Sequence, residues 1–388
     1  MKLPEFDELY LHLKIKPGLV AIYSNRVIQQ IAAGLLGFFV PIFLFIYFNS
    51  SIQSVVWFYL VITVLYGLLV PIGAMMMSRL GLKLSMILGS LFLVCYYISL
   101  YLINKNFGFA LILTIITVTL FRILYWIPYH TEFAKTTGKR SRGKEVALLF
   151  SISTLVSIAL PFIAGLVINK LGFGVLFSVS ILISIIAIIP ILLLKPVKEK
   201  FTFRYFQTFK ILFKKENRKM LFAYGGQGAE FIVGFVIWPI FIFQLLDGNY
   251  LSVGILTSLV VLVSILLRLL IGDLTDRMDK RKIIKAGSIL HAIGWFFKIF
   301  IQTAFQIFVV GAYHAFTGVV MRTSFVTLMY EQASDRGHYV DEYTVLREVS
   351  LMIGRTLMLL LILVLLSFVG LNYTFILAAL ATLLFSIL

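Results

Sequence analysis

The chain has 388 residues, of which 61% are hydrophobic and 13% are charged, and its formal net charge is +17. This composition excludes an ordinary soluble domain, because too few polar residues remain to cover a core of this size. The apolar residues form blocks of about 20, the length that a helix needs to cross a bilayer, and they lack the alternation of barrel strands. We therefore expect an all-α membrane protein.

The apolar blocks predict twelve transmembrane helices in two sets of six. The only long interruption between blocks divides the chain into an N-terminal six-helix half (1–194), a basic cytoplasmic linker (195–219) and a C-terminal six-helix half (220–388). The expected spans are 22–48, 54–78, 84–103, 108–134, 145–168, 174–194, 220–246, 250–275, 286–302, 304–330, 343–368 and 370–388.

The positive charge indicates membrane topology rather than nucleic-acid binding. Of the 34 lysines and arginines, 25 fall before the first span, in the linker or in the loops on the same side, and the opposite loops hold only Lys105 and Lys170. The positive-inside rule then predicts that both termini and the linker lie in the cytoplasm. The expected location of the protein is the plasma membrane. Residues 201–213 mix aromatics with cations, which predicts an amphipathic helix on the inner leaflet; a solvated basic tether is the alternative.

The two halves resemble each other at a steady offset. Pro41 and Pro239 are 198 positions apart, and Arg122 and Arg322 are 200 apart. The sequence KEVAL at 144–148 is matched by REVSL at 347–351, 203 positions later. Each pair falls on equivalent spans, which predicts a repeat of six helices with a binding site between the halves.

A loop motif gives the sharpest resemblance to a known family. Residues 272–282 (GDLTDRMDKRK) resemble the Gly-x-x-x-Asp-Arg-x-Gly-Arg-Lys loop of the major facilitator superfamily, with Asp279 in place of a glycine. The first-half copy, 78–83 (SRLGLK), has Ser78 in place of the acid. In this superfamily the loop locks one half against the other. The lock residues that the resemblance implies are Gly272, Asp276, Arg277 and Glu145 for one lock, and Arg79, Gly81 and Glu348 for the weaker one.

Two further motifs are similar to the same superfamily in degraded form. Residues 120–122 (LFR) resemble its span-4 arginine motif, and 161–165 (PFIAG) resemble a motif of its antiporters, although antiport is left open. The resemblance implies twelve helices in two pseudo-symmetric halves and a secondary active transporter (a permease) that moves a small solute by alternating access. It implies a monomer without cofactor or metal, and no nucleic-acid partner.

Charged residues inside the spans are functional candidates, because they are costly in lipid. Glu230, Arg122, Arg322 and Arg355 are expected about 16 to 20 Å deep, near the middle of the bilayer. Structural ion pairs are the alternative. Three arginines against one acid favour an anionic solute, and Glu230 is the expected proton-coupling carboxylate. The other candidate substrate contacts are Trp126, Trp238 and His314, whereas Lys298 is expected to snorkel outward.

Two other functions stay open at this point. Asp273, Asp276 and Asp279 form an acidic run that could hold Mg²⁺ beside a pyrophosphate in a membrane-embedded enzyme. A non-transporting receptor could use the same fold, and it would have an empty, uncharged cavity.

Overall fold

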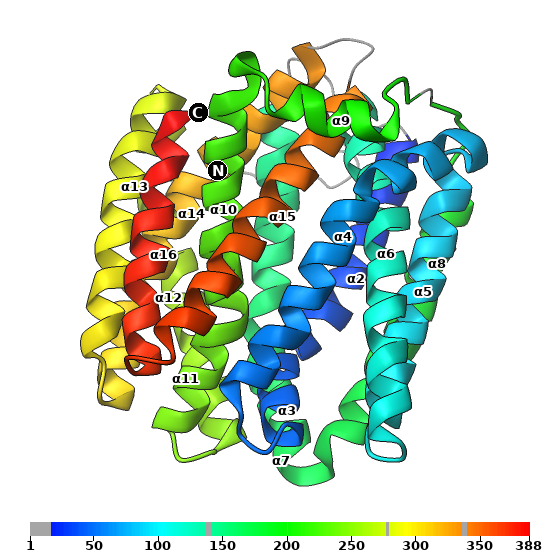
Figure 1. Ribbon diagram of the computed structural model, residues 1–388. Coiled ribbons are helices and arrows are strands. Elements are labelled where there is room, and N and C mark those ends of the chain that lie inside the picture. Colours follow the sequence, from blue (N-terminus) through cyan, green and yellow to red (C-terminus); the bar gives the residue numbers. More distant parts are fainter. Residues whose placement is uncertain (1–16, 137–141, 200, 277–278, 336–339) are drawn as a thin grey trace, which may run out of the picture.

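The structure, a computed structural model, describes residues 17–136, 142–199, 201–276, 279–335 and 340–388. Its described regular elements are all helices, and most of them run side by side in one bundle (Figure 1). Ten stretches are long and apolar enough to cross a membrane, the stretch Val156–Leu192 holds two helices, and a shorter apolar helical stretch covers Leu371–Ile387. The expectation of a twelve-helix, all-α membrane protein is confirmed.

The first half of the chain contributes the helices coloured from blue to the first green of Figure 1. The second of its long helices, Ile52–Leu80, begins at Ser51, whose hydroxyl caps the helix by accepting a hydrogen bond from the Ser54 N–H. The elements are α2 (Pro17–Gly37), α3 (Phe39–Tyr47), α4 (Ile52–Leu80), α5 (Leu82–Leu102), α6 (Phe107–Thr136), α7 (Arg142–Ile186) and α8 (Ile188–Leu192).

Helix α7 is two helices joined at a tight turn. Gly172 has φ 79° and ψ 172°, a conformation open to glycine because it has no Cβ. The chain reverses there without a loop, so α7 supplies both the fifth and the sixth of the expected spans.

The second half follows a short surface helix, α9 (Tyr205–Leu212), and supplies the green to red elements of Figure 1. These are η1 (Lys215–Asn217), α10 (Arg218–Ile232), the π-helical turn η2 (Val233–Ile237), α11 (Trp238–Leu245), α12 (Tyr250–Asp276), α13 (Lys280–Phe297), η3 (Lys298–Phe300), α14 (Ala304–Asp335), α15 (Val340–Leu365), η5 (Leu371–Tyr373), α16 (Thr374–Leu383) and η6 (Leu384–Ile387).

The two prolines of the repeat lie in similar local structure. Pro41 is in α3, just after the break that ends α2, and Pro239 is in α11, just after the π-helical turn that ends α10. The break and the π turn are the known ways in which a long helix changes direction. The superposition of the two halves remains a prediction.

Large apolar side chains cover the outside of the bundle. Phe109, Ile112, Leu182 and Val364 each expose about 60% of their surface. Exposing so many apolar groups to water would be unfavourable in free energy, whereas lipid tails solvate them. The outer surface therefore fits a bilayer.

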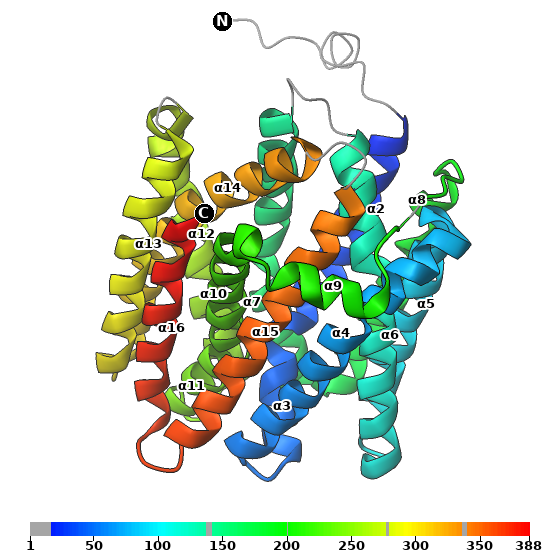
Figure 2. The ribbon, with the colours of Figure 1, turned by 45° about the horizontal axis from the view of Figure 1, so that its top comes forward.

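The linker touches both halves at one end of the bundle, which we call the linker end; the C-terminus also lies there (Figure 1). Its helix is shorter than the expected 201–213, because residues 201–204 are not helical. Helix α9 contacts both α15 and α4, which it crosses in Figure 2. The Phe201 N–H donates to Ser78 Oγ (2.8 Å), and Thr202 donates through N and Oγ1 to Glu342 Oε1 (3.0 and 2.7 Å). The linker thus joins the end of α4 to the start of α15.

An aromatic layer joins the halves near the other end of the bundle. It consists of Phe43, Phe173, Phe243 and Tyr250, which come from α3, α7, α11 and α12. Ring centroids are 4.9 Å apart for Phe43 and Phe173, 5.5 Å for Phe173 and Tyr250, and 5.1 Å for Phe243 and Tyr250. These spacings are those of packed aromatic pairs. The two halves are therefore in contact at this end.

Candidate functional site: a buried carboxylate in a central cavity

A cavity of about 910 Å³ lies between the helices of the two halves. Its lining runs from Lys298 and Ile307, toward the aromatic layer, to Met329 and Arg347, toward the linker end. Its size is that of a site for a small molecule. The charged residues among its described lining are Arg26, Glu230, Lys298, Arg322 and Arg347.

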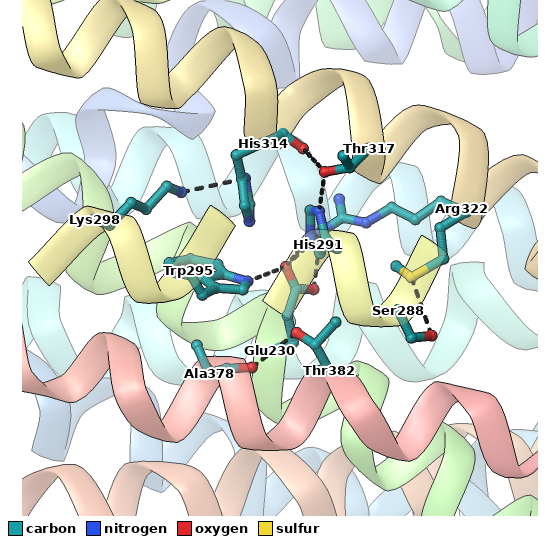
Figure 3. Close-up of polar contacts among 11 residues, drawn as sticks. Glu230, Ser288, His291, Trp295, Lys298, His314, Thr317, Arg322, Ala378 and Thr382 are labelled. Atoms are coloured by element: carbon teal, nitrogen blue, oxygen red, sulfur yellow. Dashed lines mark hydrogen bonds and ion pairs between the residues drawn. The ribbon is translucent and has the colours of Figure 1, made fainter. Parts of the chain in front are cut away.

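Glu230 is the only acid in this described lining, and it is buried, with 1% of its surface exposed. Arg322 Nη2 lies 2.7 Å from its Oε1 and 2.8 Å from its Oε2. Trp295 Nε1 donates to Oε1 at 3.2 Å, and His291 Nε2 lies 3.3 Å from the same oxygen. Figure 3 shows these three side chains converging on the carboxylate from α13 and α14. We call Glu230, His291, Trp295 and Arg322 the carboxylate cluster. A buried acid needs such donors, because an unpaired charge in the membrane is very costly.

The partners of Glu230 differ in how far their side chains are exposed to the cavity. The Arg322 side chain is 43% exposed, and it lines the cavity, whereas the His291 side chain is 1% exposed. An anion that enters the cavity can therefore reach Arg322 directly. Glu230 and His291 would stay together behind it.

Hydrogen-bond counting places an exchangeable proton between His291 and Glu230. Thr317 Oγ1 donates to the His314 backbone oxygen at 3.1 Å, so it can accept a hydrogen bond from His291 Nδ1 at 3.0 Å. His291 Nδ1 then carries a proton, and its Nε2 faces Glu230 Oε1 through a second proton, held by either partner. If the Thr317 hydroxyl turns to donate to His291 Nδ1 instead, Nδ1 carries no proton. The single ring proton is then on Nε2, and it is donated to the Glu230 carboxylate. The pair then holds one proton fewer.

Lys298 is buried in the wall of the cavity rather than snorkelling outward, so that expectation is wrong. Its Nζ lies 4.0 Å from the ring centre of Trp238 and 3.8 Å from that of Trp295, which is cation–π distance. The same Nζ lies 3.3 Å from His314 Nδ1. The indole faces stabilise the ammonium in place of water, which explains how a lysine that is 2% exposed is accommodated.

Two glycines leave the space that the rings of His291 and His314 occupy. A Cβ on Gly318 would lie 2.8 Å from His291 Cε1, and a Cβ on Gly294 would lie 2.9 Å from His314 Cδ2. The two imidazoles stack with centroids 3.8 Å apart and planes 25° apart. The pair of rings is therefore built into the packing of α13 against α14.

Glu230, His291 and His314 are residue types that bind metal ions, and their ligand atoms lie within 4.8 Å of one another. Carboxylate and imidazole groups suit Zn²⁺. The surroundings do not suit a cation, because Arg322 and Lys298 both contact members of this set. Lys298 also faces His314 Nδ1, and an ammonium can only donate. The arrangement fits an anion better than a metal.

The other predicted substrate residues divide into two groups. Trp126 and Trp238 line the cavity with His314, Glu230 and Arg322. Trp126 stacks on His130, with centroids 5.6 Å apart, and Arg26 lies 5.0 Å above its ring. Arg122 and Arg355 do not line this cavity: Arg122 lies 6.0 Å from the ring of Tyr66 and Arg355 lies 4.6 Å from the ring of Phe231.

Glu348 lies in a second buried polar group. It accepts hydrogen bonds from Arg347 Nη1 (2.7 Å) and from the hydroxyl of Tyr66 (3.0 Å). Tyr66 is on α4 and Glu348 on α15, so this bond joins the halves. Its proposed partners in the weaker lock lie elsewhere: Arg79 is exposed, and Gly81 packs on the linker, with the Leu82 N–H donating to the Val197 oxygen at 2.9 Å.

The stronger lock falls outside the described residues. This holds for Arg277 as a whole and, beyond their helical backbone, for Gly272, Asp276 and Glu145. The side chain of Asp273, from the acidic run proposed for Mg²⁺, also lies outside the described residues. Asp279 is described, and its Oδ1 accepts from the Arg281 N–H (2.7 Å) and the Lys282 N–H (3.3 Å), which caps α13. Capping gives the acid at this position a structural role, and it engages one oxygen of the carboxylate that an Mg²⁺ site would use.

Sequence reasoning missed three members of the site, His291, Trp295 and Lys298. Their spacing of four and three residues places them on one face of α13 and the turn that follows it. The signal was present, because a polar stripe on an apolar helix points inward. It was overlooked because Lys298, at the end of this helix, was expected to snorkel outward.

Comparisons with known proteins agree with this fold. Residues 220–388 match the sequence model of the Major Facilitator Superfamily. The chain is 23% identical over 298 residues to an uncharacterized protein of Bacillus subtilis strain 168, YqgE. The match covers 74% of this chain and 69% of YqgE.

A solved structure resembles nearly the whole chain. It is the crystal structure of a Major Facilitator Superfamily transporter, FucP, in the outward conformation, which matches with a TM-score of 0.62 at 13% identity. The match covers 95% of this chain and 97% of FucP. The second half of the chain thus matches the sequence model of the Major Facilitator Superfamily, and the whole chain has the fold of a transporter of that superfamily, that of a multi-pass integral membrane protein.

Proposed function

We propose that this protein is a proton-coupled secondary transporter for a small anionic solute. The observation that carries the proposal is the ion pair of Glu230 and Arg322 at the wall of the central cavity. The arginine faces the cavity, and the acid behind it contacts a histidine with which it can share a proton. A solute anion that takes Arg322 leaves Glu230 without its cation, which favours the protonated form of the acid.

Charge counting supports an anion. The described lining holds four lysines and arginines, Arg26, Lys298, Arg322 and Arg347, and one acid. A buried excess of positive charge is stabilised when a negatively charged solute binds. The same count argues against a non-transporting receptor, for which an uncharged cavity was expected.

The groups that face Glu230 explain how its proton could be exchanged. His291 and Trp295 approach from α13, Arg322 from α14, and Lys298 lies beside the cluster. Opening of the cavity to one side and then to the other would change the water around this pair. One proton could then be loaded on one side and released on the other, with both termini and the linker in the cytoplasm. The protein would act as a monomer in the plasma membrane, whereas the direction of transport is left open.

The test is solute flux in proteoliposomes with and without a pH gradient. Glu230→Gln should abolish gradient-driven accumulation, while exchange of labelled for unlabelled solute persists. Glu331→Gln is the matched control, because Glu331 also pairs with a cation, Lys280, but is partly exposed. If Glu230→Gln keeps the pH dependence of the wild type, Glu230 does not carry the proton.

A further inference from the structure

The ring of His314 has one nitrogen with a partner and one without. Its Nδ1 lies 3.3 Å from Lys298 Nζ, whereas its Nε2 is buried and has no hydrogen-bond partner among the described residues. Because an ammonium has only donors, Nδ1 must accept, and the proton of the neutral ring is on Nε2. Figure 3 shows the second ring nitrogen pointing toward Glu230, away from Lys298. A buried N–H without an acceptor is costly, so this position calls for an acceptor atom from a ligand.

Arg322 offers further donors to the same region. Its two bonds to Glu230 both use Nη2, which leaves the N–H groups of Nη1 and Nε for another acceptor. The guanidinium fork fits a carboxylate through two parallel bonds. His314 and Arg322 lie two turns apart on α14 and both line the cavity. One carboxylate could therefore accept from both.

The charge around this position suits a single negative charge. Arg322 and Lys298 carry two positive charges, and Glu230 carries one negative charge. One further negative charge neutralises the group, whereas a dianion with Glu230 ionised would leave an unbalanced charge in the membrane.

Beyond the charged group the cavity wall is apolar and aromatic. Phe231 and Phe235 stack with centroids 5.5 Å apart, and Trp238, Val260 and Leu256 also line the space. Such a wall gains from contact with apolar carbon rather than with sugar or phosphate oxygens.

We propose that the solute is an organic monocarboxylate with an apolar body, whose carboxylate accepts hydrogen bonds from His314 Nε2 and Arg322. This rests on the proposed transport function and names its solute class. Figure 3 shows His314 and Arg322 on the same side of the cluster as Glu230, where such a carboxylate would bind.

The test is equilibrium binding to the purified full-length chain, without any gradient. Thermal stabilisation and tryptophan fluorescence are measured with aliphatic and aromatic monocarboxylates of four to ten carbons, with the neutral amide of each acid, and with inorganic phosphate. We expect at least one acid to bind roughly tenfold or more tightly than its amide, the effect of a hydrogen-bonded charge, and phosphate not to compete. The proposal is overturned if no acid binds better than its amide or if phosphate competes fully.

Two variants locate the binding group. The Gln amide nitrogen can replace His Nε2 as a donor, whereas the shorter Asn replaces only Nδ1. His314→Gln should keep the preference for acid over amide, and His314→Asn should lose it. Equal loss in both variants, with both still folded, would exclude the Nε2–H as the donor. Because binding needs no proton gradient, a failure of proton coupling in the Glu230→Gln flux experiment would leave this result unaffected.

Discussion

The hydroxyl of Tyr66 on α4 donates a 3.0 Å hydrogen bond to Glu348 Oε2 on α15, and so joins the two halves of the bundle through buried atoms. The repeat in the sequence had placed Glu348 near the start of an equivalent span, and the resemblance had assigned it to a lock with Arg79 and Gly81. Its contacts in the structure are instead Tyr66 and Arg347. The pair is therefore a direct link between halves that would have to move relative to each other in the proposed transport cycle.

Tyr66→Phe should shift the balance between conformations away from the one described here. The lost hydrogen bond to a charged group contributes about 1.5–3 kcal/mol, so a shift of roughly tenfold or more is expected if the bond breaks in the other conformation. The measurement is maleimide labelling of Ala315→Cys, a cavity position, in a Cys95→Ser background.

Tyr59→Phe is the matched control for Tyr66→Phe. Tyr59 is also buried on α4, but within the described part of the chain its hydroxyl has no hydrogen-bond partner. Its removal should leave the labelling rate within the error of the parent. Equal effects of the two substitutions would show that the Tyr66 hydroxyl has no special role.

A close helix crossing gives a second prediction. A Cβ on Gly254 of α12 would lie 2.4 Å from the Pro161 oxygen of α7, and a Cβ on Gly165 would lie 2.5 Å from the Tyr250 oxygen. Gly254→Ala must therefore push the two backbones apart, at a cost of about 1–3 kcal/mol in this conformation. We expect a lower unfolding temperature and altered labelling of the Ala315→Cys reporter. Gly108→Ala, where a Cβ meets nothing within 4 Å, should change neither.

The fold could be predicted from the sequence because membrane helices are recognised by their length and apolar composition. Only helices and closed barrels satisfy backbone groups in lipid, so apolar blocks of about 20 residues leave few choices. Glu230 and Arg322 were predicted for a similar reason, because a charge inside a span needs a partner or a function. Their contact with each other required the structure, since they lie 92 positions apart on α10 and α14.

The rest of the site could not be read from spacing alone. Lys298 has the sequence position of a residue that snorkels at a helix end, and its inward direction depends on Trp238, which is 60 positions away on α11. Arg122 and Arg322 are equivalent in the repeat, yet Arg322 lines the cavity while Arg122 lies beside Tyr66 outside its lining. Matching positions in the predicted repeat therefore do not determine which partners each arginine contacts.

Arg322→Gln should destabilise the protein, and a second substitution should relieve part of the loss. The Arg322 side chain is partly exposed but Glu230 is buried, and removing the partner of a buried charge costs up to about 3–5 kcal/mol. Glu230→Gln in the same chain removes that charge, and the double variant should unfold at a higher temperature than Arg322→Gln alone. The measurement is thermal unfolding of the purified variants at neutral pH. A double variant no more stable than the single one would contradict the ion pair.

Thr317→Val tests the proton shared by His291 and Glu230. Valine has nearly the shape of threonine, but it cannot accept from His291 Nδ1 or donate to it, so the hydroxyl rotation that changes the proton count is lost. We expect pH-driven accumulation in proteoliposomes to fall while exchange without a gradient is retained. Thr327→Val is the control, since the Thr327 hydroxyl bonds only to the Thr323 oxygen of its own helix among the contacts described. If both valines lower pH-driven accumulation equally, the effect belongs to α14 as a whole, and the role of Thr317 in proton exchange is excluded.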